Sequence, residues 1–147
     1  MAEIRKLTEN LYVAPQLSEG DIADVDSAGF RAILCNRPDG EEAGQPEYDR
    51  IRTQADALGL MCEFQPVDGA NISDTDVDNF AAELQDLPGP VLAYCRSGTR
   101  CTVLWALSQA GHRTTDDILQ IAASAGYSLD PLRPRLEQRA QTINGGK

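Results

Sequence analysis

The sequence has few of the residues on which metal sites and disulfide frameworks depend. It contains four cysteines and one histidine in 147 residues. Cys35, Cys62, Cys95 and Cys101 form no CxxC pair, and His112 stands at no metal-ligand spacing from them. We therefore expect no metal and no cofactor, and we expect reduced thiols in a cytoplasmic protein.

Long apolar runs and positive charge are also scarce. No run reaches the roughly 18 apolar residues of a transmembrane helix, and the first residues lack the basic-then-apolar pattern of a signal peptide. Thirteen Lys and Arg against 23 Asp and Glu give a net charge of −10, which argues against nucleic acid or a membrane as a partner. A small anionic or phosphorylated substrate then needs a local basic site, for which Arg37, Arg96 and Arg100 are the candidates.

The most informative stretch begins at the apolar run Val91–Tyr94, which follows Pro88-Gly89-Pro90 and predicts a buried strand. Residues 101–110 are apolar nearly all round and are followed by Gly111, which predicts a buried helix with a glycine just past its end. A loop of small residues joins the two. Cys95 stands at the entrance of this loop and Arg100 at its exit.

This arrangement predicts a nucleophile seated in an anion-binding loop. Backbone N–H groups of a tight loop at a helix N-terminus converge on one point and attract negative charge. The same field lowers the pKa of a cysteine such as Cys95 and favours the reactive thiolate. Arg100 adds a planar fork that can hold two oxygens of an oxyanion, and Gly98 permits the backbone conformation that such a turn needs.

Strands and helices alternate along the rest of the chain. We expect strands at 4–7, 11–14, 30–35, 61–65 and 91–94, and helices at 18–27, 46–58, 73–87, 101–110, 114–125 and 130–141. The alternation predicts one α/β domain over residues 1–147, with a mostly parallel sheet of four to five strands flanked by helices and a frayed tail at 143–147. Three polar loops, 36–40, 66–69 and 95–100, should then open at the same edge of the sheet.

Two families seat a cysteine and an arginine in this way. Only four residues separate Cys95 from Arg100, whereas cysteine-dependent protein phosphatases usually have one residue more. Rhodanese-type sulfurtransferases often carry the shorter loop, and CRSGTR is close to their common form. The loop alone therefore leaves both families open.

The remainder of the chain favours the phosphatases. The segments NRPDGE at 36–41, PV at 66–67, ILQIA at 118–122 and AGYSL at 125–129, together with the loop, resemble a bacterial phosphatase-like domain family that occurs alone or fused to β-lactamase-like hydrolases linked with sulfide metabolism. The resemblance runs from the first strand to about residue 130. It implies a dual-specificity-phosphatase-like fold and a cysteine-dependent hydrolase of phosphomonoesters.

The resemblance also implies roles for individual residues. Cys95 matches the nucleophile, which forms a thiophosphate intermediate, and Arg100 matches the residue that binds the phosphoryl oxygens. Asp68, just after Pro66-Val67, is the expected general acid, with Asp74 as the fallback. The expected substrate-binding residues are Arg96, Ser97, Gly98, Thr99 and Arg37.

Two positions depart from the phosphatase pattern. Tyr94 precedes the nucleophile where phosphatases usually have histidine, and Cys101 follows the arginine where they have serine or threonine. A thiol is a weaker donor than a hydroxyl, so turnover should be slower. Cys101 is also a candidate redox partner for Cys95.

Two other functions remain open. A sulfurtransferase would carry a persulfide on Cys95 and would need no general acid. A binding or sensor module would keep the anion cradle without turnover.

Overall fold

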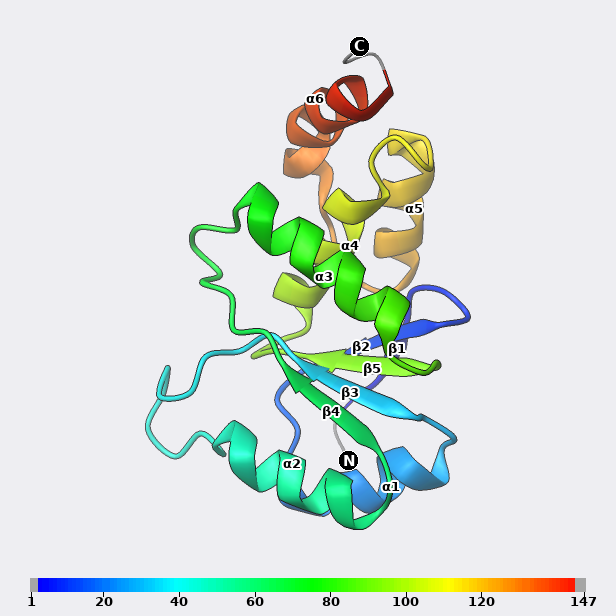
Figure 1. Ribbon diagram of the computed structural model, residues 1–147. Coiled ribbons are helices and arrows are strands. Elements are labelled where there is room, and N and C mark those ends of the chain that lie inside the picture. Colours follow the sequence, from blue (N-terminus) through cyan, green and yellow to red (C-terminus); the bar gives the residue numbers. More distant parts are fainter. Residues whose placement is uncertain (1–2, 145–147) are drawn as a thin grey trace.

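A single five-stranded sheet forms the centre of the protein in the computed structural model, which describes residues 3–144 (Figure 1). The strands are β1 (Arg5–Lys6), β2 (Leu11–Ala14), β3 (Ala32–Cys35), β4 (Met61–Phe64) and β5 (Val91–Tyr94). Their order in the sheet is β1-β2-β5-β3-β4. β1 pairs antiparallel with β2, and the other pairs are parallel. The expected mostly parallel sheet is confirmed.

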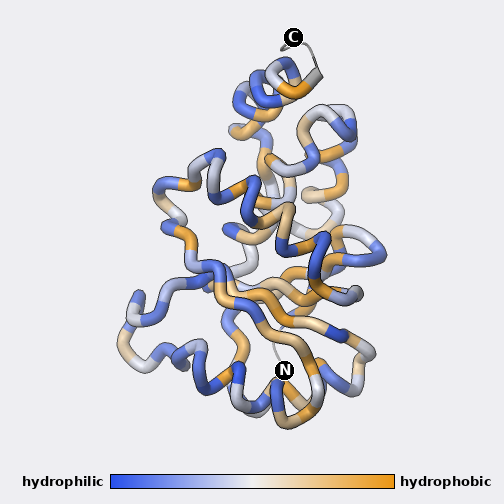
Figure 2. The backbone as a smooth tube through the Cα atoms, in the orientation of Figure 1, coloured by the Kyte–Doolittle hydropathy of each residue, from blue (hydrophilic) through white to orange (hydrophobic). Residues whose placement is uncertain are grey.

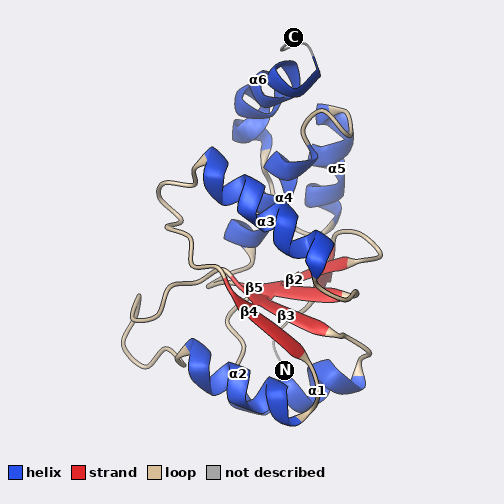
Figure 3. Cartoon of the chain, in the orientation of Figure 1, coloured by secondary structure: helices blue, strands red, loops and turns tan. Residues whose placement is uncertain are grey.

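Within residues 3–144, six helices lie on the two sides of this sheet. They are α1 (Ile22–Ser27), α2 (Tyr48–Ala57), α3 (Asp74–Asp86), α4 (Thr99–Gln109), α5 (Thr115–Ser124) and α6 (Arg133–Asn144), with 3-10 turns η1 (Glu19–Asp21) and η2 (Asp130–Leu132). Figure 3 shows α1 and α2 on one face and α3 to α6 on the other. No helix within residues 3–144 is long and apolar enough to cross a membrane.

The two-residue period of a strand explains this three-layer arrangement. In β5, Val91 and Ala93 join the core beneath α3 and α4, while Leu92 and Tyr94 join the core against α1 and α2. All four residues of β5 are buried, and Figure 2 shows hydrophobic, orange segments in the central strands. A strand that is buried on both faces has a continuous run of apolar residues, and this run predicted β5 from the sequence. Cys95 comes next and falls on the α4 side.

Several helix ends follow from the caps in the sequence. Ser73 accepts a hydrogen bond from the Asp76 N–H at 3.0 Å, and the Asp76 carboxylate accepts one from the Ser73 N–H. This reciprocal pair fixes the start of α3. Thr114 caps α5 in a similar way, because its hydroxyl accepts from the Asp117 N–H.

Some predicted boundaries were wrong. The helix expected from 18 to 27 is a 3-10 turn followed by α1, the helix expected from 101 begins at Thr99, and the last helix runs to Asn144 rather than 141. The predicted tail at 143–147 thus overlaps α6 at 143 and 144, and residues 145–147 lie outside the described residues. The strand expected at 61–65 is present as β4, which is an edge strand whose Met61 and Phe64 side chains are exposed.

Candidate active site

The three polar loops meet at the carboxyl ends of β3, β4 and β5. Arg100, at the start of α4, donates from Nη1 to the Val67 carbonyl at 3.0 Å and to the Asn36 carbonyl at 3.4 Å. One guanidinium therefore joins the loop after β5 to the loops after β3 and β4. The sequence prediction that these loops share an edge is confirmed.

Cys95 is buried directly after β5, at the start of the loop that leads to α4. The residue is 1% exposed, and its sulfur accepts a hydrogen bond from the Gly98 N–H at 3.1 Å. The Cys101 thiol, together with backbone N–H groups of residues 97, 98 and 101, outweighs the effect of burial and lowers the pKa of Cys95 to about 6. A pKa below neutrality favours the thiolate of Cys95, which is the nucleophilic form of a cysteine.

The source of this shift differs in part from the expectation. The loop amides lower the pKa of Cys95 as predicted, but the largest contribution comes from the Cys101 thiol, and the Arg100 guanidinium is not among the main causes. Burial and the hydrogen bond to Cys95 raise the pKa of Cys101 far above its ordinary value. Cys101 therefore stays protonated and donates to the thiolate.

Arg100 is engaged by a carboxylate that the sequence analysis gave no role. Nη1 and Nη2 of Arg100 donate to Oε2 and Oε1 of Glu41 at 3.1 and 3.2 Å. Gly69 lies against the same guanidinium, and a Cβ at that position would stand 2.9 Å from Nε of Arg100. Glycine at position 69 thus allows the loop after β4 to approach the arginine closely.

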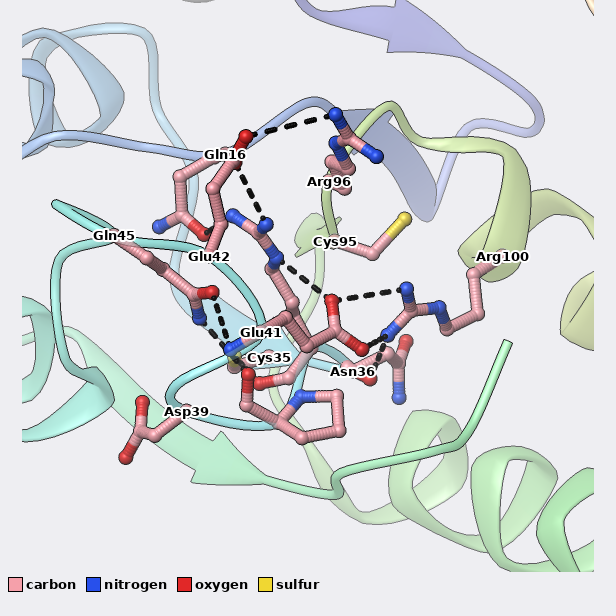
Figure 4. A network of polar contacts seen from close by, with 12 residues as sticks. Gln16, Cys35, Asn36, Asp39, Glu41, Glu42, Gln45, Cys95, Arg96 and Arg100 are labelled. Carbon is pink, nitrogen blue, oxygen red and sulfur yellow. Dashed lines mark hydrogen bonds and ion pairs between the residues drawn. The ribbon is translucent and has the colours of Figure 1, made fainter. Parts of the chain in front are cut away.

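A network of charges surrounds Glu41 (Figure 4). Arg37 is buried, and its Nε donates to Glu41 Oε1 at 2.9 Å, its Nη2 to Glu42 at 3.1 Å and its Nη1 to Gln16 at 3.0 Å. Glu42 also pairs with the exposed Arg96 at 3.6 Å. Partial burial opposes the ionisation of Glu41, but the hydrogen bonds from Arg100 and Arg37 prevail and lower its pKa. The Glu41 carboxylate therefore occupies Arg37 and Arg100, two of the arginines that were predicted to bind a substrate anion.

The loop that carries Glu41 is itself held in place. The Gln45 side chain accepts from the Glu41 N–H at 3.1 Å and donates to the Pro38 carbonyl at 2.9 Å. Asp39 accepts from the Tyr48 N–H at 2.8 Å, which ties the loop to the start of α2.

A pocket of about 440 Å³ opens over this network. Arg37, Glu41, Glu42, Asp68, Gly69, Ala70, Arg96 and Arg100 line it. The predicted acid Asp68 is thus in the same pocket as Arg100, and its Oδ1 accepts from the Ala70 N–H at 3.0 Å. The fallback Asp74 lies elsewhere, since it pairs with Arg135 and Arg139 of α6 at 3.2 and 3.3 Å.

The remaining predicted residues form the loop itself. Gly98 has φ +92° and is the N-cap of α4, so glycine is needed here because other residues rarely adopt this conformation. The Ser97 hydroxyl donates to Thr99 Oγ1 at 3.1 Å and accepts from the Thr99 N–H at 3.4 Å. These two side chains are exposed and bond to each other. Their contact stabilises the turn.

Sequence reasoning missed Glu41 and Tyr127. Glu41 ends NRPDGE, a segment quoted for the resemblance, but it pairs with an arginine 59 residues away, and no local pattern indicates that pairing. Tyr127 donates to the Ser97 carbonyl at 3.2 Å. Its position in AGYSL, a segment quoted for the resemblance, was the one signal that could have drawn attention to it.

A mostly parallel sheet with helices on both faces, and a cysteine-arginine loop before α4, are typical of a phosphatase-like domain. Residues 3–112 match the family model described as "Beta-lactamase hydrolase-like protein, phosphatase-like domain", and the chain belongs to this family. The expected resemblance is confirmed.

Relatives of known sequence and structure agree with this assignment. The chain is 32% identical over 140 residues to the beta-lactamase hydrolase-like protein of Agrobacterium fabrum, covering 94% of this chain and 32% of the relative. It therefore spans about a third of the length of the curated relatives it matches.

Solved structures show the same fold. A candidate phosphatase from Neisseria meningitidis is 38% identical with a TM-score of 0.85, over 92% of this chain and 97% of that one. The catalytic core of the PP-IP phosphatase SIW14 from S. cerevisiae has a TM-score of 0.69 at 15% identity, over 97% and 92% of the two chains. At that identity the likeness concerns the fold alone.

Proposed function

We propose that this domain is a cysteine-dependent phosphatase of small phosphomonoesters. The observation that carries the proposal is the Cys95 sulfur, whose pKa is lowered to about 6 and which lies in the loop that also supplies Arg100. The family and the candidate phosphatase from Neisseria support the same reaction class. A phosphoryl group bound at Arg100 would face an ionised sulfur at neutral pH.

Binding begins with an exchange of anions on Arg100. The Glu41 carboxylate holds Nη1 and Nη2 of this guanidinium, and the phosphoryl oxygens of the substrate would replace it. A dianionic phosphate carries more charge than a carboxylate and presents three oxygens, so the exchange favours the substrate. Arg37 keeps its bond to Gln16 throughout and serves as the fixed partner of Glu41.

The first chemical step transfers the phosphoryl group to sulfur. The Cys95 thiolate attacks phosphorus, an S–P bond forms, and the bond between phosphorus and the alcohol oxygen breaks. Asp68 gives a proton to the departing alkoxide, which leaves as the alcohol. Arg100 and the loop N–H groups stabilise the charge on the equatorial oxygens.

The second step hydrolyses the thiophosphate. Asp68, now ionised, takes a proton from a water molecule, the water oxygen attacks phosphorus, and the S–P bond breaks. The electron pair returns to Cys95 as thiolate, which the Cys101 thiol and the loop N–H groups stabilise. Inorganic phosphate leaves the pocket, and Glu41 returns to Arg100.

Two phosphate esters with different leaving groups test this mechanism. The Cys95→Ser variant should lose turnover of both p-nitrophenyl phosphate and phenyl phosphate. Asp68→Asn should lower kcat by about 100-fold for phenyl phosphate, whose leaving group needs a proton, and much less for p-nitrophenyl phosphate. Asp74→Asn is the matched control, because its carboxylate pairs with α6. Equal losses for the two esters would remove Asp68 from the acid role.

Sulfur transfer is the second candidate function, and the short loop favours it. Four residues separate Cys95 from Arg100, which makes a tighter cradle than a phosphatase loop. In this reaction the Cys95 thiolate would take the outer sulfur of thiosulfate and release sulfite, and the persulfide would then pass that sulfur to cyanide. Sulfur transfer would be favoured by a mass increase on Cys95 equal to one sulfur atom, together with equal thiocyanate formation by the wild type and Asp68→Asn. If phosphate binds and neither reaction turns over, the domain is an anion-binding module.

A further inference from the structure

We propose that Tyr127 is a positioning residue for the nucleophile: its hydroxyl fixes the orientation of the Ser97–Gly98 peptide, whose N–H group holds the Cys95 sulfur. This role rests on the proposed function of Cys95. It concerns a residue outside the pocket, on the segment between α5 and η2.

The two hydrogen bonds involved use opposite ends of one peptide unit. Tyr127 Oη donates to the Ser97 carbonyl oxygen at 3.2 Å, and the Gly98 N–H donates to Cys95 Sγ at 3.1 Å. In a planar trans peptide the C=O and the following N–H point in opposite directions. A hydroxyl that holds the carbonyl outward therefore holds the N–H inward, on the sulfur.

The peptide needs such a restraint because Gly98 is one of its two residues. Gly98 adopts φ +92°, where glycine has access to many conformations that other residues lack. Rotation of the Ser97–Gly98 peptide would turn a carbonyl oxygen toward the thiolate and remove an N–H group from it. A Cβ at position 98 would collide with the Tyr127 hydroxyl, so glycine also permits the close approach of this tyrosine.

Tyr127 is in turn well placed by its own neighbours. Its N–H donates to the Ala122 carbonyl at 2.9 Å, at the end of α5. Arg5 of β1 donates to the Ala125 carbonyl at 3.0 Å, which ties the same turn to the edge of the sheet. The tyrosine thus connects the nucleophile loop to a helix end and to β1.

The protonation state of Tyr127 suits a donor. Burial raises its pKa, the charge of Arg5 acts in the opposite direction, and Cys95, Cys101 and Glu3 raise it further. The hydroxyl therefore keeps its proton at neutral pH. A bond donated to a peptide carbonyl also polarises the peptide, which strengthens the hydrogen bond that its N–H makes.

The test is the pKa of Cys95 in the Tyr127→Phe variant of the full chain. The rate of alkylation of Cys95 by iodoacetamide is measured from pH 4 to pH 9, with mass spectrometry to identify the modified cysteine. Loss of the hydroxyl should raise the pKa of Cys95 by about 0.5 to 1 unit, since one hydrogen bond to a charged group weakens. The alkylation rate at pH 6 should fall about 2- to 5-fold.

Tyr12→Phe is the matched control. Tyr12 lies on β2 and packs edge-on against Phe30, and its variant should leave the pKa of Cys95 unchanged. Thermal unfolding of both variants ensures that the pKa is read on folded protein. An unchanged Cys95 pKa in Tyr127→Phe, or an equal rise in Tyr12→Phe, overturns the proposal. Because the assay uses no substrate, a wild-type protein without phosphatase turnover would refute the proposed function and leave this result intact.

Discussion

Arg100 has two partners that compete for the same nitrogen atoms. Glu41 occupies Nη1 and Nη2, which are the groups that an incoming phosphate would use. The Glu41 side chain is 28% exposed and the Arg100 side chain 13%, so the pair lies where solvent screening is partial. An ion pair of this kind contributes roughly 1 kcal/mol. Such a contact is strong enough to order the guanidinium and weak enough to be replaced by a dianion.

This balance predicts the effect of the Glu41→Gln substitution. Removing the negative charge should free Arg100 for anions, so inorganic phosphate and vanadate should inhibit turnover at about 5-fold lower concentration. Inhibition constants for the two anions provide the measurement. Glu42→Gln is the control, since Glu42 pairs with Arg37 and Arg96, and it should have the smaller effect. Weaker inhibition of Glu41→Gln would mean that Glu41 orders Arg100 more than it competes for it.

Among the structural elements, the junction of β5 and α4 brings two thiols together. The loop turns at Gly98, and Thr102 Oγ1 donates to the Gly98 carbonyl at 2.8 Å, which closes the first turn of α4. Cys101 lies in that turn, fully buried, and donates to the Cys95 thiolate. Burial raises the pKa of Cys35 to about 12 and that of Cys62 to about 11, so neither thiol shares the low pKa of Cys95.

The proximity of these thiols predicts a disulfide under mild oxidation. The Cys95 thiolate attacks an oxygen of hydrogen peroxide, forms a sulfenic acid and releases hydroxide. The Cys101 sulfur then attacks the Cys95 sulfur, an S–S bond forms, and water leaves. Mass spectrometry of a peroxide-treated sample should show a loss of two hydrogens within the peptide that holds both residues. In Cys101→Ser the expected product is sulfinic acid on Cys95, and the same product in the wild type would exclude Cys101 as a redox partner.

The elements that were predicted well are those with a local signal. The apolar runs at 11–14 and 91–94 match β2 and β5. A strand of a parallel sheet that is covered on both faces is a continuous apolar run, so the run alone predicts it. Ser73 marked the start of α3 through its capping pattern. The loop with Cys95 and Arg100 was also readable, because its residues are consecutive in the chain.

The features that were missed depend on contacts between distant residues. Glu41 meets Arg100, and Tyr127 meets Ser97, across 59 and 30 residues. The Cys101 thiol was interpreted as a weak donor, and nothing in the sequence indicated that it is the largest cause of the low Cys95 pKa. The relative size of each contribution to the Cys95 pKa depends on burial and on the distances between groups, neither of which a sequence supplies.

At the scale of the whole molecule, the thiolate links catalysis to folding. Cys95 belongs to the core between the sheet and α4, so its charge is buried when the chain folds. The folded state nevertheless favours the charged form, since the pKa falls from 9.0 to about 6. A group that is more acidic in the folded state stabilises the fold whenever it is ionised.

The pKa of Cys95 in the unfolded chain, 9.0, and in the folded protein, about 6, fix how stability depends on pH. The stabilisation is complete above pH 9, where the cysteine of the unfolded chain is also ionised, and it disappears as the pH falls through about 6. Between these limits the free energy of unfolding should rise by up to about 1.4 kcal/mol per pH unit relative to Cys95→Ser, which lacks the ionising group. Urea unfolding of both proteins at pH 5, 7 and 8.5 measures this difference, and subtraction cancels the titration of groups that the two share. A difference that stays constant with pH would show that Cys95 is an ordinary thiol, and the proposed nucleophile would lose its basis.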